Sequence, residues 1–433
     1  MANLNENSTN YFHSYEPNTN DLTMAMDYDP YGNPIIRVDN TTQQHTAKNR
    51  LKVSNQELQY FNTFQYGRDT NIWDESTTNG ASLEFDQYLG MVKMTVTSQQ
   101  GSQAIQQSKR VIRYIPGRQN ELSFSVIFTM PAAGIRRRIG LFDEQGGFYF
   151  EDGGDGNYYC VLRRNTAQGV VETRVARQDW NVDPLDGNGP SGYIGDPNAV
   201  QMVTFEYDWY GAGQVEVNWI IKNNKYPIHQ FDTGNIEPHT WTSTPFLPVR
   251  KEITNITGAA GTHSMYVGST SIYAESETSI IGRESNAASP ITGTSTGNSA
   301  NVFVPILSIR LKSDRLRGVV LPIDFQAATL DNTAIFYRLI SNPVLTGASW
   351  VSAGAESFVE YDTSATSYTN GTVLKTGYLS SSNQGDIIKF DRQVNTQLAR
   401  NNLGTTSEIL SIEIASTQAN KAAFASINWI EIR

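Results

Sequence analysis

The sequence predicts an all-β fold built from two antiparallel β-sandwich or jelly-roll domains. Short segments throughout the chain alternate apolar and polar residues with a period of two, which is typical of half-buried strands. Only 18% of the residues are charged, and Ser, Thr, Asn and Gly are abundant, which favours strands and turns over long surface helices. Turn residues, rather than helical segments, separate the strands, so we expect antiparallel pairing.

The clearest element is a hairpin within VTFEYDWYGAGQVEVNWII, residues 203–221. Its apolar residues recur at every second position on both sides of a break at residues 211–213, which predicts two paired strands. Since side chains of a strand alternate between faces, one set is expected in the core and the other in solvent. The expected buried residues are Val203, Phe205, Tyr207 and Trp209, and the expected exposed ones are Thr204, Glu206 and Asp208.

Domain boundaries follow changes in composition. Residues 1–40 are polar, with prolines that interrupt any regular element, and they predict an N-terminal arm that gains order by docking on a neighbour. Residues 41–281 are expected to form the first sandwich. Residues 282–301 have few large apolar side chains and predict a linker or long loop. Residues 302–433 are expected to form the second sandwich.

Within the first sandwich, residues 47–64 are the one segment expected to form a sizeable helix. The strand-like segments after it are residues 83–86, 91–96, 111–114, 122–128, 135–142, 148–150, 158–162 and 264–267. The strand-like segments of the second sandwich are residues 302–311, 335–340, 358–361, 387–390, 410–414 and 427–432. The last of these is expected to lie inside a sheet.

The composition argues against several classes of function. A net charge of −10 argues against a nucleic-acid partner, because a phosphate backbone requires clustered basic residues. No apolar run approaches the roughly 20 residues that span a bilayer, so no membrane insertion is expected. The N-terminal residues do not have the pattern of a secretory signal. Cys160 is the only cysteine, so no intrachain disulfide can form, which agrees with synthesis in a reducing compartment.

No metal or cofactor is expected. The five histidines are His13, His45, His229, His239 and His263. No two of them have the spacing that places both imidazoles on one metal ion. The acidic, Gly-rich residues 151–157 offer oxygen ligands suited to calcium, but they lack the order and closing Glu of an EF-hand. This segment and residues 179–187 are interpreted as solvated turns, with calcium as the alternative.

No catalytic residues are expected either. The sequence lacks a GxSxG elbow, a GxxxxGK[ST] loop and a GxGxxG loop that opens a helix after a strand. Glycoside hydrolysis on a β-sandwich requires two facing carboxylates, and Glu206, Asp208 and Glu216 would share one face of the predicted hairpin. Such a row is either catalytic or the solvated face of an antiparallel sheet, and the clean alternation favours the second interpretation.

The triplet of Arg136, Arg137 and Arg138 lies in a strand-like segment. Because successive side chains of a strand point to opposite faces, at least one arginine is expected to oppose the others. The triplet therefore predicts ion pairs in a sheet or at a subunit contact rather than a phosphate-binding patch. The expected partners are the nearby acidic residues Asp143 and Glu144.

Several sequence segments follow one another in a specific order along residues 48–433. They are SKRVIRYIPGR (108–118), LSFSVIF (122–128), RRRIGLFDEQGGFYFED (136–152), DWNVDPLDGNGPSG (179–192), FEYDWYGAGQVEV (205–217), TPFLPVRKEITN (244–255) and LPIDFQAATLDNTAIFYRLI (321–340). Together they resemble a group of virion structural proteins of tailed bacteriophages, especially phages of marine cyanobacteria and other marine bacteria. The resemblance implies lectin-like or jelly-roll β-sandwiches and a place in the phage particle, and it assigns no functional residues.

We therefore expect a non-enzymatic virion structural protein, assembled in the host cytoplasm and located in the tail, at the baseplate or a fibre attachment. Its expected partners are other virion proteins and its own copies, in a homo-oligomer of trimer or hexamer symmetry, because particle parts repeat around an axis. The alternatives are a capsid-surface spike, a receptor-recognition protein that binds a host surface glycan, and a glycan depolymerase. For glycan binding the candidates are Trp180 and Tyr193 in loops, since Trp209 and Trp219 are expected in the core.

Overall fold

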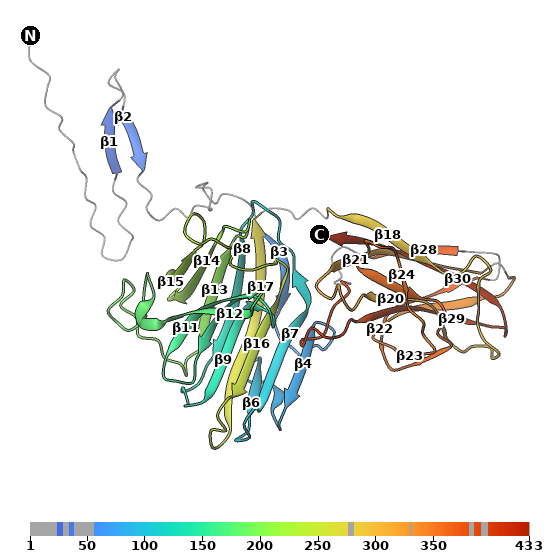
Figure 1. Cartoon of the computed structure of the whole chain (residues 1–433), viewed down its shortest axis with the longest axis horizontal. Helices are drawn as coiled ribbons and strands as arrows, with labels where there is room; N and C mark the ends of the chain where they lie inside the picture. The colour runs from blue at the N-terminus through green and yellow to red at the C-terminus, as the bar shows by residue number, and fades with distance from the viewer. Residues whose placement is uncertain are drawn as a thin grey trace, which may run out of the picture. The chain divides into compact units, whose positions relative to one another are not determined.

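The computed structural model describes residues 24–28, 34–38, 56–275, 281–329, 331–380, 385–390 and 397–432. Strands and turns make up these residues, apart from one short 3-10 helix, η1 (Arg177–Asp179) (Figure 1). The predicted all-β fold class is confirmed, and the chain divides into one unit at Met1–Asn55 and another at Gln56–Arg433. Within the described residues, no helix has the length and apolar character needed to cross a membrane.

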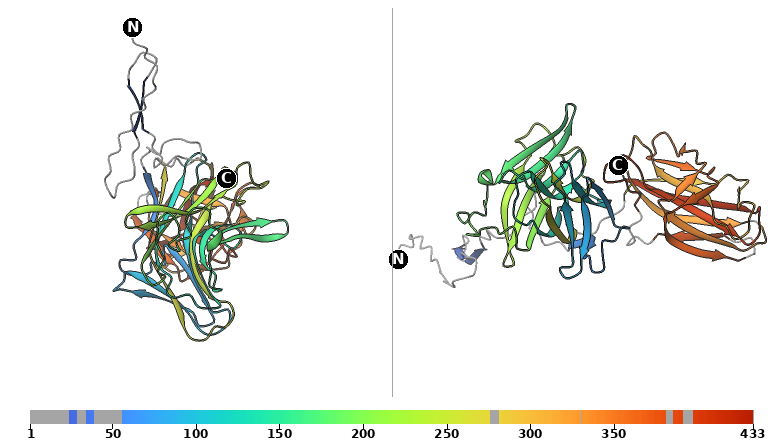
Figure 2. Two further views of the ribbon diagram at one scale, coloured as in Figure 1. Left: turned by 90° about the vertical axis from the view of Figure 1, so that its left-hand side faces the viewer. Right: turned by 90° about the horizontal axis from the view of Figure 1, so that it is seen from below.

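The first sandwich consists of two antiparallel sheets that share one hydrophobic core (Figures 1 and 2). The seven-stranded sheet has the order β12-β11-β10-β9-β16-β7-β4. Its strands are β4 (Trp73–Thr78), β7 (Gln103–Ile112), β9 (Ile135–Phe142), β10 (Gly147–Asp152), β11 (Tyr158–Thr166), β12 (Gly169–Ala176) and β16 (Leu247–Asn255). The eight-stranded sheet contains β3 (Gln56–Asn62), β5 (Ser82–Asp86), β6 (Met91–Val96), β8 (Asn120–Ile127), β13 (Gln201–Tyr207), β14 (Gln214–Ile221), β15 (Asn224–Asp232) and β17 (His263–Glu275).

The second sandwich also consists of two antiparallel sheets around its own core. One contains β18 (Arg283–Ala288), β19 (Thr294–Ser295), β21 (Val319–Thr329), β28 (Gly385–Lys389) and β30 (Ala422–Ile432). The other contains β20 (Val304–Leu311), β22 (Ile335–Ser341), β24 (Val351–Ser352), β25 (Val359–Asp362), β27 (Thr372–Leu379) and β29 (Ile409–Ser416), and a separate pair consists of β23 (Val344–Thr346) and β26 (Ser367–Thr369). As predicted, the last strand lies inside a sheet, since β30 is flanked by β18 and β21.

The structure corrects the linker predicted at residues 282–301. Both β18 and β19 lie in this segment, and both pair antiparallel with β30. A strand held by backbone hydrogen bonds to its neighbour does not require large apolar side chains, so the local composition was a poor guide. One small side chain of the segment, Ala287, is buried in the second core.

The N-terminal part differs from expectation in two ways. In the arm, β1 (Met24–Tyr28) and β2 (Pro34–Val38) form an antiparallel pair, although the composition predicts no regular element there. Within the segment predicted as a helix, β3 pairs with β17, so sheet pairing overrides the local helical tendency. Residues 47–55, the two N-terminal histidines and the docking of the arm lie outside the described residues.

The predicted hairpin is present as β13 and β14, but its polar face is not solvated. Val203, Phe205 and Tyr207 are fully buried, as predicted, and Trp209 is partly buried. The prediction that their alternate neighbours are exposed is wrong, because Thr204, Glu206 and Asp208 are also buried. A period of two identifies the two faces of a strand but does not say what packs on each face.

A lysine lies in the core of the first sandwich. Lys251 is fully buried, and its Nζ lies 4.6 Å from the ring centroid of Trp73 and 4.8 Å from that of Phe64. Its Nζ donates to the backbone oxygen of Gly268 at 3.2 Å. Burial lowers the pKa of Lys251 well below its ordinary value, because the apolar surroundings disfavour the charged form.

Replacing this lysine is expected to change how stability depends on pH. Because the folded-state pKa lies below the unfolded value of 10.5, the unfolded chain binds the proton more readily, and stability should rise as the pH approaches 10.5. The slope from this one group is at most ~1.4 kcal/mol per pH unit. The free energy of unfolding of Lys251→Met, measured in urea between pH 6 and 10, should lack this rise with pH. The free energy of unfolding of Lys93→Met, changed at a partly exposed position of β6, should keep it. Identical slopes in Lys251→Met and the native chain would contradict the assignment.

Candidate functional site

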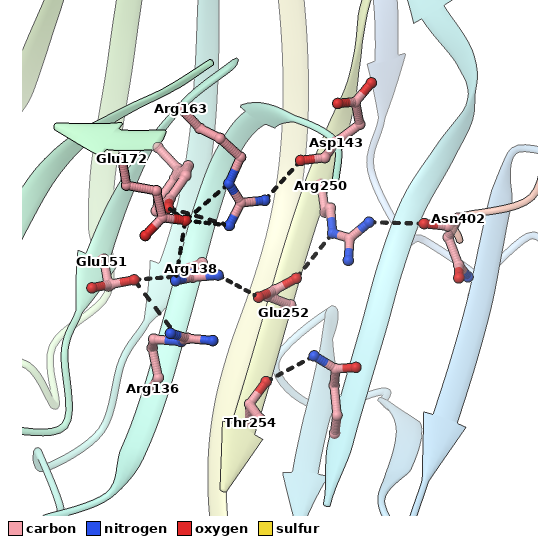
Figure 3. A network of polar contacts seen from close by, with 12 residues as sticks. Arg136, Arg138, Asp143, Glu151, Arg163, Glu172, Arg250, Glu252, Thr254 and Asn402 are labelled. Carbon is pink, nitrogen blue, oxygen red and sulfur yellow. Dashed lines mark hydrogen bonds and ion pairs between the residues drawn. The ribbon is translucent and has the colours of Figure 1, made fainter. Parts of the chain in front are cut away.

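A cluster of paired acidic and basic side chains lies on the outer face of the seven-stranded sheet, away from the core. Residues on this face alternate along β9 and β10 with core residues such as Ile139 and Phe150. We call the following residues the charged face: Arg136, Arg138, Tyr149, Glu151, Arg163, Glu172, Arg174, Arg250 and Glu252. Figure 3 shows the central part of this network.

Strand register aligns opposite charges on the charged face. Arg138 of β9 lies opposite Glu151 of β10 on one side and opposite Glu252 of β16 on the other. Nearer the edge of the sheet, Arg163 of β11 lies opposite Glu172 of β12. Since directly opposite residues place their Cβ atoms about 5 Å apart, this register brings each arginine within reach of a carboxylate.

Arg138 is at the centre of the cluster and is only 3% exposed. Its Nε donates to Oε2 of Glu151, and its Nη1 donates to Oε1 of Glu252 at 3.1 Å. Its Nη2 lies 3.8 Å from Oε1 of Glu172, and the guanidinium carbon lies 4.9 Å from the ring centroid of Tyr149. A buried charge is tolerated when it is paired and hydrogen-bonded, and three carboxylates meet that condition for this arginine.

Glu252 is held as an anion. Burial alone would raise its pKa, but the guanidinium groups of Arg250 and Arg138 outweigh burial and lower the pKa to about 2. The Nε of Arg250 donates to Oε2 of Glu252 at 3.0 Å. Both oxygens of this buried carboxylate therefore accept hydrogen bonds from arginines.

Glu172 lies at the solvent boundary of the same cluster, with a side chain that is 26% exposed. Burial acts to raise its pKa, but the Tyr149 hydroxyl and the guanidinium groups of Arg138 and Arg163 lower it below its ordinary value. The Tyr149 hydroxyl donates to Oε1 of Glu172 at 2.8 Å, and Nη2 of Arg163 donates to the same oxygen at 2.7 Å.

The charged face brings carboxylates together without the difference in protonation that glycoside hydrolysis requires. One carboxyl group of a catalytic pair has to stay protonated near neutral pH to act as the general acid. Glu172 and Glu252 are instead kept ionised by their arginine neighbours. Glu151 accepts hydrogen bonds from Arg138 and Arg174. The arrangement is suited to holding strands in register rather than to proton transfer.

The arginine triplet forms ion pairs, as predicted, but with other partners. Arg137 points into the core, opposite to its neighbours, and pairs with Asp152. Arg136 and Arg138 lie on the outer face and approach Glu151. The expected partners Asp143 and Glu144 are close in sequence, whereas the observed acids are placed by strand pairing.

Asp143 and Glu144 belong to a contact between the two sandwiches. Asp143 is fully buried, and its Oδ2 accepts hydrogen bonds from Arg317 and Arg400, which come from the second sandwich. The Nη1 of Arg400 donates to Oε1 of Glu144 at 2.9 Å. Burial acts to raise the pKa of Asp143, but the two guanidinium groups lower it.

The charged face contacts the same segment of the second sandwich. The Nη1 of Arg250 donates to the backbone oxygen of Asn402 at 2.9 Å (Figure 3). The backbone nitrogen of Asn402 donates to Oδ2 of Asp74 at 2.6 Å. A continuous set of polar contacts therefore leads from the charged face to the second sandwich.

The acidic row predicted on the hairpin is not a facing pair across a cleft. Glu206 and Glu216 lie directly opposite each other on β13 and β14, and Lys225 bridges them. Asp208 accepts a hydrogen bond from the backbone nitrogen of Gln214 at 3.0 Å, so it closes the hairpin turn. Each acid has a structural partner.

In the two acidic loops considered for calcium, carboxylates are paired or hydrogen-bonded to other groups of the chain. Asp152 pairs with Arg137, and Asp155 accepts from the Tyr159 hydroxyl at 2.7 Å. In the second loop, Asp183 accepts from the backbone nitrogens of Leu185 and Ser191, each at 2.8 Å. Among the described residues, no group of three or more His, Cys, Asp or Glu side chains is arranged to hold a metal ion.

The described histidines and the two loop aromatics each have internal contacts. His229 is buried, which lowers its pKa to about 4, while His239 lies 3.4 Å from Glu237. His263 contacts the backbone oxygen of Ala260. Trp180 is 8% exposed, and its indole donates to the backbone oxygen of Val175 at 3.1 Å, so it is part of the core rather than an exposed platform. Tyr193 is also packed against that core.

No family model and no curated protein matches the chain. A pseudo beta-1,3-glucanase of Mycobacterium tuberculosis is 10% identical with a TM-score of 0.36, and the match covers 51% of this chain and 99% of that one. A legume lectin-like domain from Entamoeba histolytica is 11% identical with a TM-score of 0.29, covering 47% and 90%. Arcelin-5, a lectin-like defense protein from Phaseolus vulgaris, is 11% identical with a TM-score of 0.31, covering 50% and 99%. Likeness at this level assigns no activity or ligand to this chain.

Removing the charge of Glu252 tests whether the charged face is structural. Glu252→Gln leaves two largely buried guanidinium groups without their shared carboxylate, so we expect a loss of about 3–5 kcal/mol in the free energy of unfolding near pH 7. Glu216→Gln, at a side chain that is 18% exposed and 3.5 Å from Lys225, should cost less than about 1 kcal/mol.

The loss caused by Glu252→Gln is expected to depend on pH. The folded-state pKa of about 2 lies below the ordinary value of 4.5, so the contribution of Glu252 is complete above pH 4.5 and is lost as the pH falls toward 2. The difference between Glu252→Gln and the native chain should shrink across this window. Urea denaturation at a series of pH values measures it, and a constant difference would contradict the assignment.

Proposed function

We propose that the chain is a non-enzymatic structural protein of a tailed-bacteriophage particle, a component of the tail at the baseplate or at a fibre attachment. The ordered series of sequence segments along residues 48–433 supports this class of protein. The net charge of −10 and the small fraction of charged residues fit a chain that contacts protein neighbours rather than nucleic acid.

The observation that carries the proposal is the state of the charged face. Its carboxylates pair with arginines on neighbouring strands of the seven-stranded sheet. Side chains committed in this way hold neighbouring strands together, and the arginines keep Glu172 and Glu252 ionised. A component that presents fixed surfaces to its neighbours requires this kind of rigidity.

The contact between the sandwiches supports the same function. Buried Asp143 holds two arginines of the second sandwich, and Arg250 reaches the backbone of Asn402. An ion pair that is largely removed from water is screened little by salt. Such a contact would keep two sandwiches in a fixed relation within a particle part.

The aromatic pocket near Trp180 gives little support to glycan binding. The aromatic pocket formed by Phe150, Tyr158, Trp180 and Trp219 has a volume of about 30 Å³. Ligand pockets usually have roughly 300–1,000 Å³. A sugar ring would not enter this pocket without displacement of its walls. Receptor recognition is therefore the alternative, and the experiment below distinguishes it from the proposed function.

Cryo-electron microscopy of the intact particle that contains this chain tests the proposal. We expect density for both sandwiches at the tail, repeated around its axis, with each copy in contact with other virion proteins. Density on the capsid surface instead would favour the spike alternative. Absence of the chain from purified particles by mass spectrometry would contradict the proposal. Binding of the purified protein to host surface glycans, with its loop face free in the particle, would favour the receptor-recognition alternative.

A further inference from the structure

The edge strand β12 of the seven-stranded sheet is largely exposed. Among the described residues, β11 is its only strand neighbour, and the hairpin of these two strands, green in Figure 2, extends beyond the rest of the first sandwich. Val170 and Val171 on β12 are 47% and 41% exposed. Soluble proteins usually protect such an edge with charged side chains, proline or a bulge. The strand β12, with the sequence GVVETRVA, has no proline or bulge, and its two charged residues, Glu172 and Arg174, have opposite signs.

The sequence of β12 is complementary to itself when two copies run antiparallel about Thr173. In that register Glu172 lies opposite Arg174 of the second copy, and Val171 lies opposite Val175 of the second copy. A two-fold axis repeats each contact, because the same patch is used on both copies. Registers centred one residue away would place Glu172 against Glu172 or Arg174 against Arg174, and like charges directly opposite are destabilising.

Both charged residues of β12 keep a polar atom available for this contact. The hydrogen bonds that Glu172 accepts from Tyr149 and Arg163 go to its Oε1, and Figure 3 shows its other oxygen pointing away from them. Arg174 donates to Glu151 through Nε and Nη2, which leaves its Nη1 without a partner among the described residues. Their side chains are 26% and 35% exposed, so each can reach a second partner without losing the first.

We propose that a second copy of this chain binds at β12, edge to edge, and joins the two seven-stranded sheets into one continuous sheet. The charged face then continues across the two-fold axis through Glu172 and Arg174. The occupant is a second copy because the match of charges and valines is a property of this strand with itself. The contact goes beyond the proposed function and does not depend on it. It fits a hexamer of dihedral symmetry, and a trimer would require a different contact.

A single cysteine at the two-fold axis tests the register. Directly opposite residues of an antiparallel pair have Cα atoms about 4.5–5.5 Å apart, which suits a disulfide. Full-length Thr173→Cys should therefore form a covalent dimer on mild oxidation, seen on a non-reducing gel. The native Cys160 is fully buried and should not contribute. Val171→Cys is the matched control, because it lies four residues from its own copy in this register, about 13 Å away, and should stay monomeric on the gel.

Sedimentation measures the contact without a crosslink. The full-length protein should dimerise or form larger even-numbered assemblies, and Val171→Lys should weaken the association by about tenfold or more, because it brings a charge against an apolar partner. Val373→Lys, the same change at a 48% exposed position of the edge strand β27, should leave the association unchanged. Circular dichroism of each variant checks that it is folded.

Each outcome either supports or overturns the proposed contact at β12. A covalent dimer with Thr173→Cys but not Val171→Cys, together with association that only Val171→Lys weakens, supports the proposal. A monomeric native chain, an assembly insensitive to Val171→Lys, or equal crosslinking by both cysteine variants overturns it. Because none of these measurements uses a phage particle, their failure would leave the proposed virion function as it stands.

Discussion

The structure of the first sandwich depends on one buried guanidinium, that of Arg138, and on the carboxylates that strand pairing places around it. Removing an arginine from water costs several kcal/mol, and attraction to neighbouring acids offsets this cost only when the geometry is good. Here the geometry is set by backbone register, which aligns Glu252, Arg138 and Glu151 across three adjacent strands. A slip of one residue would turn every side chain of a strand to the opposite face and leave these charges unpaired in the core. The polar cluster therefore specifies which register of β9, β10 and β16 is stable.

The same cluster links two ends of the sheet that have different roles. On one side, Glu252 and Arg250 lead to the backbone of Asn402, close to the buried Asp143 that holds Arg317 and Arg400. On the other side, Arg163 and Arg138 lead to Glu172 on the edge strand β12. A contact at the free edge would thus be built on side chains that are already fixed from the interior. For a protein that assembles by its surfaces, the same ion pairs that join the inner strands therefore also hold the edge strand β12 in place.

The sequence predicted the all-β class and the position of the hairpin because period-two alternation reflects the geometry of a strand. It also predicted that at least one arginine of the triplet at residues 136–138 opposes the others, and the structure shows that this one is Arg137. The partners of these arginines were wrong because they come from register between β9, β10 and β16, which local sequence does not contain. In the segments YFED and VRKEIT, Glu151 and Glu252 lie two positions from Tyr149 and Arg250 and so share a strand face with them, and this spacing was the available signal. The linker predicted at residues 282–301 was wrong, and so was the helix predicted at residues 47–64 over the part that β3 occupies, because pairing with β30 and β17, rather than local composition, determines those strands.

The measurement that tests this account most directly is a double-mutant cycle between Arg138 and Glu252, using Arg138→Met, Glu252→Gln and the double variant. The unfolding free energies of all four proteins in urea at pH 7 give the coupling between the two side chains. If Arg138 is the charge on which the register depends, the double variant should be more stable than the sum of the single losses predicts, by at least about 1.5 kcal/mol. Additive losses, within about 0.5 kcal/mol, would contradict the account.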